Sequence, residues 1–114
     1  MSELQGIARL RIHDGRLEEF KRLAGRCMEI VRTRDSGTLQ YELFFNDDQS
    51  ECIVLERYRD SAALMEHFAN LGELADATMA TGSVSGELLG NPSAELQAAL
   101  AASPVSLFTP FQPT

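Results

Sequence analysis

Hydrophobic and polar residues alternate along residues 5–12, and this period of two is typical of a half-buried strand. One face of that strand carries Ala8, Leu10 and Ile12, and the other carries Ile7, Arg9 and Arg11. In residues 14–34 the apolar positions recur at the three- or four-residue spacing of a helix, and Gly37 follows as a stop signal. The chain therefore begins with a strand and a helix.

Two further strands are predicted over residues 38–45 and 51–59, which are rich in β-branched, aromatic and leucine residues. The turn-forming stretch NDDQS separates them, so we expect an antiparallel hairpin. If Phe45 pairs with Cys52, one face of the hairpin is the more apolar, and we expect the helices to cover it. That face comprises Leu39, Tyr41, Leu43, Phe45, Cys52, Val54, Glu56 and Tyr58.

A second helix is predicted after a cap at Asp60 or Ser61, and Gly72 interrupts it before a continuation to Met79. One face of this helix carries Leu64, His67, Phe68 and Leu71. The glycine-punctuated stretch TGSVSGELLG predicts a weaker fourth strand. Strand, helix, strand, strand, helix, strand is the order of an α+β ferredoxin-like domain, a split βαβ arrangement of four antiparallel strands with both helices on one face.

The last part of the chain, residues 91–114, extends beyond that arrangement. Asn91 as a cap and Pro92 at the first helical position predict a short helix through Ala102, after which VSLFTPF is expected to run extended. We therefore expect a ferredoxin-like domain over residues 1–90 and a tail over residues 91–114. The tail is expected to pack on the domain or on a dimer partner.

Composition narrows the possible partners. The chain has 114 residues, enough for one domain, and a formal net charge of -7 from 17 acidic and 10 basic residues. Such a charge repels phosphate backbones and anionic lipid, so we expect a small, neutral or weakly charged ligand, with no nucleic acid and no membrane as partner. No signal peptide or membrane span is recognisable, and a cytoplasmic location is expected.

No sequence motif indicates a cofactor. There is no phosphate-binding loop, no dinucleotide fingerprint and no histidine cluster at metal-ligand spacing, so no nucleotide or metal cofactor is predicted. Cys27 and Cys52 are interpreted as small core residues.

Candidate chemistry centres on His67, which the second helix should place against the hairpin face that carries Glu56, Tyr41 and Tyr58. A histidine beside a carboxylate in an apolar setting is oriented and made more basic, as a general base requires. The alternative is that His67 is a hydrogen-bonded core residue and that Tyr41 and Tyr58 only pack.

Three stretches, GIARLRIHDGRLEEFKRLA, SGTLQYELFF and VLERYRDSAALMEHFAN, together resemble the antibiotic biosynthesis monooxygenase domain, a family of dimeric α/β barrels. The resemblance covers residues 6–89. Members typically have a Glu-x-aromatic-x-Asp strand end followed by a helix with a histidine, and the matching positions here are Glu56, Tyr58, Asp60 and His67.

The resemblance implies a homodimer in which two sheets face each other, and a cofactor-free oxidation of a small aromatic phenol or hydroquinone to a quinone. His67 and Glu56 would then be catalytic. The substrate would be bound by Tyr41, Tyr58, Leu10, Ile12, Leu64, Phe68 and Leu71. The chain has no tryptophan, which argues against haem degradation and against any mechanism that needs an indole.

Two other functions stay open at the level of sequence. The same pocket would serve a non-catalytic module that binds or sequesters a small apolar metabolite, whereas a purely structural dimer domain would have no ligand pocket at all. A dimer is also suggested by Phe44, Ile53 and Leu55, which lie on the hairpin face turned away from the helices and need cover from water.

Overall fold

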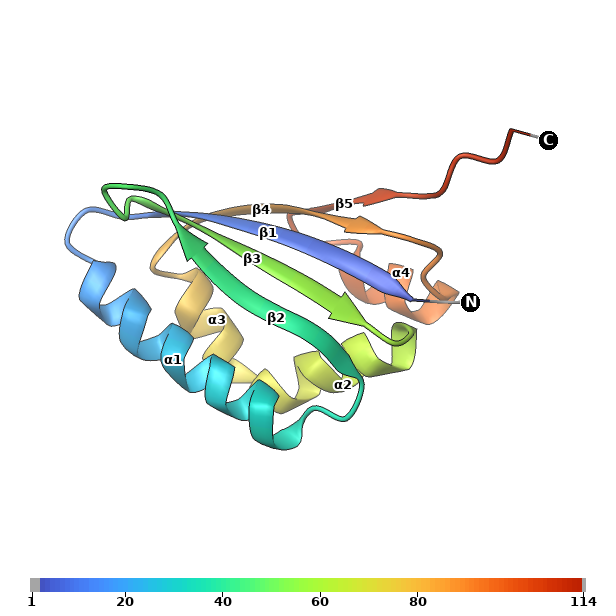
Figure 1. Cartoon of the computed structure of the whole chain (residues 1–114), viewed down its shortest axis with the longest axis horizontal. Coiled ribbons are helices and arrows are strands. Elements are labelled where there is room, and N and C mark those ends of the chain that lie inside the picture. The colour runs from blue at the N-terminus through green and yellow to red at the C-terminus, as the bar shows by residue number, and fades with distance from the viewer. Residues whose placement is uncertain (1–2, 114) are drawn as a thin grey trace.

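The computed structural model describes residues 3–113, in which one sheet carries helices on one of its faces (Figure 1). The elements follow in the order β1 (Leu4–Ile12), α1 (Leu17–Arg34), β2 (Thr38–Phe45), β3 (Glu51–Tyr58), α2 (Ser61–Leu71), α3 (Glu73–Met79), β4 (Gly82–Leu89), α4 (Ala94–Leu100) and β5 (Val105–Phe108). The first seven elements reproduce the predicted ferredoxin-like order, with the second helix divided into α2 and α3.

The sheet has the strand order β2-β3-β1-β4-β5. The first four of these strands are antiparallel to their neighbours, as predicted, whereas β5 runs parallel to β4 with Val105 opposite Gly86. The described part of the sheet therefore has five strands in place of the expected four. Two parallel neighbouring strands require a crossover connection between them. Helix α4 lies in the crossover that joins β4 to β5.

Pairing within the hairpin follows the expected register, with Phe45 opposite Cys52. A register shift between Thr38 and Gln40 interrupts this ladder, and Leu39 is 47% exposed. The expectation that Leu39 faces the helices is therefore wrong, because a bulge changes the alternation at that point. Thr38 lies opposite Tyr58 instead.

Helix α1 buries the stripe of side chains that its spacing predicts. Helix α2 begins after Asp60, whose carboxylate accepts a hydrogen bond from the Ala63 amide at 2.8 Å. Gly72 has a φ of 52°, a left-handed conformation that favours glycine, and it ends α2 so that α3 can start in a new direction. The two helices and α1 lie on the same side of the sheet (Figure 1).

The tail folds back on the rest of the chain. Helix α4 begins at Ala94 because the Ser93 hydroxyl caps it, accepting a hydrogen bond from the Leu96 amide at 3.1 Å. The predicted cap at Asn91 is therefore wrong, and the helix starts later than expected. Leu96 is fully buried in a cluster with Leu4 and Tyr58.

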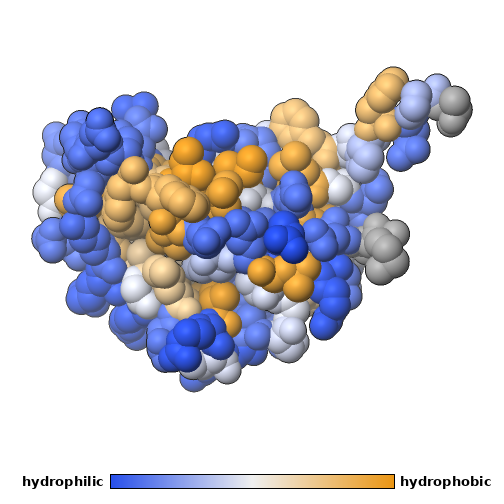
Figure 2. Space-filling view, in the orientation of Figure 1, coloured by the Kyte–Doolittle hydropathy of each residue, from blue (hydrophilic) through white to orange (hydrophobic). Residues whose placement is uncertain are grey.

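The outer face of the sheet remains uncovered in this chain. Phe44 and Ile53 are cross-strand partners, 50% and 38% exposed, and Ile7 pairs with Leu55 beside them. Figure 2 shows hydrophobic side chains gathered over the strands and bordered by hydrophilic residues. Within residues 3–113, no helix has both the length and the apolar character that a membrane crossing needs.

Candidate functional site

A cavity of about 390 Å³ lies between the sheet and the helices, and its lining is mostly apolar. Strand β1 contributes Leu10, and helix α2 contributes Leu64, Phe68 and Leu71, all of which were predicted as substrate-binding residues. Ile12 does not line the cavity, because it packs in the core with Phe20 and Cys52. The volume falls in the range of small-molecule sites.

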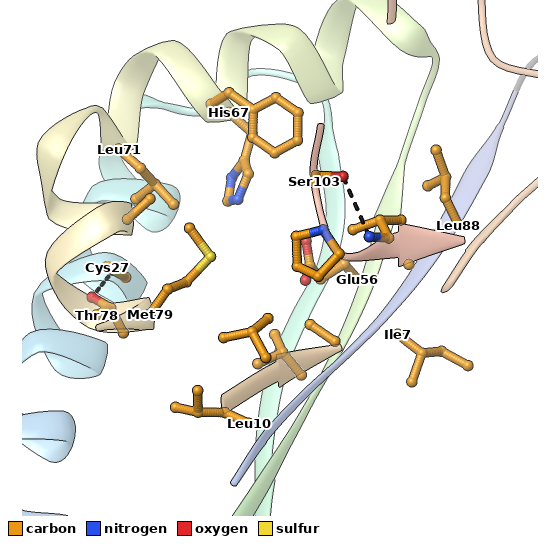
Figure 3. A pocket seen from close by; sticks show the side chains of 18 of the residues that line it. Ile7, Leu10, Cys27, Glu56, His67, Leu71, Thr78, Met79, Leu88 and Ser103 are labelled. Atoms are coloured by element: carbon orange, nitrogen blue, oxygen red, sulfur yellow. Dashed lines mark hydrogen bonds between the residues drawn. The ribbon is translucent and has the colours of Figure 1, made fainter. Parts of the chain in front are cut away.

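His67 reaches this cavity from the middle of α2. The residue is 3% exposed, and Figure 3 shows the imidazole directed into the space between α2 and the strands, with Met79 of α3 entering the same space. The rings of Tyr41 and Tyr58 lie 5.4 and 5.2 Å from the His67 ring, centroid to centroid. The structure therefore gathers His67 and both tyrosines at one wall.

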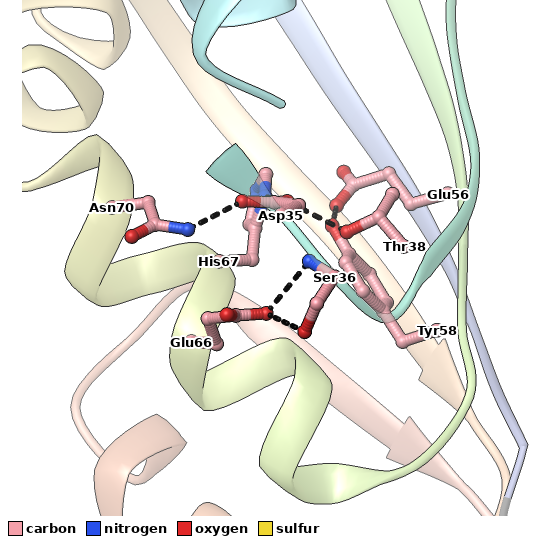
Figure 4. Close-up of polar contacts among 8 residues, drawn as sticks. All are labelled: Asp35, Ser36, Thr38, Glu56, Tyr58, Glu66, His67 and Asn70. Atoms are coloured by element: carbon pink, nitrogen blue, oxygen red, sulfur yellow. Dashed lines mark hydrogen bonds and ion pairs between the residues drawn. The ribbon is translucent and has the colours of Figure 1, made fainter. Parts of the chain in front are cut away.

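The hydrogen-bond partner of His67 is Asp35, not Glu56. The His67 Nδ1 atom lies 2.8 Å from the Asp35 Oδ2 atom, and the carboxylate also accepts hydrogen bonds from Asn70 Nδ2 at 2.8 Å and Thr38 Oγ1 at 2.6 Å (Figure 4). The Asp35 side chain is 1% exposed. This arrangement is a buried carboxylate held by three donors, one of which is the imidazole.

The protonation of this pair follows from its environment. Burial raises the pKa of Asp35, but the hydrogen bonds from Asn70, Thr38 and His67 outweigh it, so that the net pKa lies below the ordinary aspartate value. An ionised carboxylate only accepts hydrogen bonds, so Nδ1 of His67 carries the proton. When the ring is neutral, its Nε2 atom is left with a free lone pair, which is what a general base needs.

The loop that carries Asp35 is fixed to α2 by a second set of contacts. The Ser36 amide and hydroxyl donate to Glu66 Oε1 at 3.0 and 2.9 Å (Figure 4). Gly37 lies so close to α2 that a Cβ atom there would be 2.5 Å from the Cβ atom of Ala63. Gly37 thus allows the loop to approach the helix closely enough for Asp35 to meet His67.

Glu56 occupies the same wall but has a different partner, because the Tyr58 hydroxyl donates a hydrogen bond to its Oε1 atom. Burial raises the pKa of Glu56, although the Tyr58 hydrogen bond and the proximity of His67 oppose the shift. Burial and the Glu56 charge raise the pKa values of Tyr41 and Tyr58 far above the ordinary tyrosine value. Both phenols therefore stay protonated.

Cysteine chemistry has little support at this site. Cys27 lines the cavity, its Sγ atom lies 3.4 Å from Thr78 Oγ1, and burial raises its pKa, so the reactive thiolate is disfavoured. Cys52 is buried outside the cavity lining. Among residues 3–113, no group of three or more His, Cys, Asp or Glu side chains is placed to hold a metal ion.

Sequence reasoning missed Asp35, Thr38 and Asn70. Asn70 follows His67 by three residues, a spacing that places both on one side of a helix, so a signal for it was present. The sequence around Asp35 indicates only the end of a helix. Asp35 and His67 are 32 residues apart in the sequence, and their contact depends on the path of the loop that carries Asp35.

The fold and the cavity together define a ferredoxin-like α+β domain with an internal site between its sheet and its helices. The family model for antibiotic biosynthesis monooxygenase matches residues 6–77, more than half of the sequence. The chain belongs to the antibiotic biosynthesis monooxygenase family.

Several solved structures share this fold. MupZ from Pseudomonas fluorescens is 23% identical, covers 100% of this chain and 94% of its own, and has a TM-score of 0.81. Rv0793 from Mycobacterium tuberculosis is 22% identical over 81% of this chain and 97% of its own, with a TM-score of 0.70. SnoaB, a cofactor-independent oxygenase from Streptomyces nogalater, is 21% identical over 77% of this chain and 91% of its own, with a TM-score of 0.67.

Identities this low establish a common fold, and a search of curated proteins gives no significant match. Membership of this family supports a monooxygenase-like function for the chain.

Proposed function

We propose that this protein is a cofactor-independent monooxygenase that oxidises a small phenol or hydroquinone to a quinone with dioxygen. The observation that carries the proposal is the buried His67, oriented by the Asp35 carboxylate at 2.8 Å and directed into a mostly apolar cavity. A base in an apolar site is what a phenol needs to become an electron-rich anion that reacts with dioxygen by itself.

The proposed reaction balances without a further reductant. His67 Nε2 accepts the proton of the substrate hydroxyl, and the resulting anion transfers one electron to dioxygen. A bond then forms between a ring carbon and one oxygen atom, the O–O bond breaks, and the second oxygen atom leaves as water with two hydrogens from the substrate. The substrate thus supplies all four electrons that reduce dioxygen.

The other polar groups of the wall have supporting roles in this proposal. The Tyr41 hydroxyl, kept protonated by its raised pKa, donates a hydrogen bond to a substrate oxygen, whereas the Tyr58 hydroxyl donates its hydrogen to Glu56. Glu56, whose pKa is also raised, takes up or returns a proton during the loss of water. The apolar residues Leu10, Leu64 and Leu71 exclude bulk water from the anion.

An oxygen electrode tests this function directly. Purified protein, treated with a metal chelator and free of added flavin or nicotinamide, is mixed with a panel of phenols and hydroquinones. We expect protein-dependent oxygen consumption with at least one member and a quinone product. Identical traces with and without protein across the panel would contradict the proposal. Tight binding of a panel member without oxygen consumption would favour the non-catalytic binding module.

A further inference from the structure

The tail forms part of the cavity, although it lies outside the residues that the family model matches. Leu100, Ser103, Pro104 and Val105 all line the main cavity, whereas the family match ends at residue 77. Ser103 lines the same space as His67 and Glu56 (Figure 3). One wall of the candidate site is therefore built by the segment that joins α4 to β5, which we call the tail wall (residues 100–105).

The tail wall is held in place at both ends. On one side, α4 is anchored by the fully buried Leu96, and on the other, Val105 pairs with Gly86 of β4. Between them, the Ser103 hydroxyl donates to the Leu100 carbonyl at 2.8 Å and accepts a hydrogen bond from the Val105 amide at 3.3 Å. The wall is thus a defined structural element of the site.

A second hollow of about 240 Å³ lies on the α4 side of this wall. It shares Leu88, Leu100 and Val105 with the lining of the main cavity, so these three aliphatic side chains border both spaces. Its remaining lining residues are Pro92, Gln97, Ala101 and Leu107. None of the seven is charged, and this hollow therefore suits an apolar group.

The two spaces differ in polarity, and this difference favours one orientation of a bound ligand. The polar groups Glu56, His67, Tyr41 and Tyr58 lie in the main cavity, whereas the α4 hollow offers only apolar side chains and one amide. A ligand with a polar aromatic head and an apolar chain matches both. The apolar chain of such a ligand would pass between the aliphatic side chains that border both spaces.

We infer that the tail wall determines substrate specificity, and that the substrate class is a phenol or hydroquinone with an alkyl substituent that runs past Leu100 and Val105 into the α4 hollow. The inference rests on the proposed function, because the hydroxyl group of the ligand is taken to lie beside His67. Leu100 and Val105 set how long a chain is accommodated, because their side chains border both spaces.

The test is a series of alkylhydroquinones, from methyl to octyl, whose binding is measured by calorimetry under argon so that no oxidation takes place. Affinity should rise about fourfold for each added methylene until the available space is filled, and then level off. Two variants change the passage in opposite directions. We call the alkyl chain length at which affinity stops rising the levelling point. Leu100→Ala should move the levelling point to longer alkyl chains, and Val105→Phe should move it to shorter ones.

Controls separate this effect from misfolding. Leu39→Ala removes the same atoms from a leucine that is 47% exposed and lines neither space, so its levelling point should equal that of the wild type. In Leu39→Ala methylhydroquinone should also bind as in the wild type, and thermal unfolding should show that all three variants are folded.

A levelling point that is the same in Leu100→Ala, Val105→Phe and wild type would overturn the inference. An affinity that does not rise with alkyl chain length would also overturn it, as would the absence of binding by every member of the series. Oxygen consumption is measured separately on the same ligands. Chain-length selection without oxygen consumption would support the tail wall and contradict the proposed reaction. Oxygen consumption without chain-length selection would do the reverse.

Discussion

Asp35 controls the orientation of His67, although it comes from a loop and not from the helix that carries the histidine. Its carboxylate accepts hydrogen bonds from Thr38, Asn70 and His67, which fixes the imidazole with Nδ1 protonated. An amide at this position would present its own donor group and allow the opposite tautomer. The role of Asp35 is therefore one of positioning.

We predict that Asp35→Asn lowers kcat by about 100-fold, the usual contribution of a general base, while KM changes little. The measurement is steady-state oxygen consumption with the best substrate of the panel. Glu66→Gln is the matched control, because it removes a carboxylate from the helix that carries His67 but keeps an acceptor for Ser36. A drop of equal size in both variants, or a rise in KM alone, would argue against positioning by Asp35.

Glu56 makes stability depend on pH in a direction opposite to that of Asp35. Because burial raises the pKa of Glu56, its contribution is fully present below the unfolded carboxyl pKa and is lost as pH rises through the folded value. The lowered pKa of Asp35 gives stability that is present above the unfolded value and lost as pH falls through the folded one.

Glu56→Gln should therefore gain stability relative to the wild type as pH rises above about 4.5, the ordinary glutamate value. Urea unfolding of both proteins at a series of pH values from mildly acidic to mildly alkaline measures this difference. A difference between the two proteins that stays constant over the whole series would show that Glu56 is not perturbed by burial.

Individual residues of the site were predictable to the extent that periodicity determines which face they occupy. The alternation of β3 and the spacing of α2 placed Glu56, Tyr58 and His67 on facing surfaces, and the structure brings them to one cavity wall. The contact between Asp35 and His67 was not predictable in this way, because a loop has no periodicity and its path is set by contacts such as Gly37 against Ala63.

At the level of elements, the tail is the part that sequence patterns described least well. The segment Val105–Phe108 is too short for an alternating pattern to predict that it pairs with β4. Its parallel pairing also depends on the position of the crossover through α4, which no sequence pattern indicates. Likewise, the bulge at Leu39 depends on pairing geometry with β3. By contrast, the long amphipathic α1 and the hairpin register were predictable because their apolar patterns are long and regular.

Docking of α4 should make a measurable contribution to the stability of the fold. Leu96 is fully buried in the cluster with Leu4 and Tyr58, so Leu96→Ala should lower the free energy of unfolding by about 2–5 kcal/mol. The exposed Leu39 provides the control, and its replacement by alanine should cost less than about 1 kcal/mol. Equal, small effects in urea unfolding of the two variants would mean that the tail does not stabilise the domain.

At the level of the whole molecule, the uncovered sheet face predicts a second copy of the chain. Members of the family are typically dimeric, and Phe44, Ile53, Leu55 and Ile7 form an apolar surface on the sheet face opposite the helices. We expect a homodimer of the 12.6 kDa chain in sedimentation equilibrium at micromolar concentration.

Ile53→Asp should shift this equilibrium to the monomer, because it places a charge in the proposed interface. Met28→Asp introduces the same charge at a residue of α1 that is 44% exposed, and this variant should stay dimeric. A wild-type protein that sediments as a monomer at micromolar concentration would contradict the expected assembly.

The most direct measurement for the whole account is the rate of oxygen consumption of wild type, His67→Ala and His67→Gln with one quinol substrate and no added cofactor. Both variants lack the proton-accepting nitrogen, and the glutamine amide retains a donor for Asp35, so that the carboxylate is not left without its partner. We predict that both are folded by circular dichroism and at least about 100-fold slower than the wild type. Variants that consume oxygen as fast as the wild type would contradict the assignment of His67 as the base.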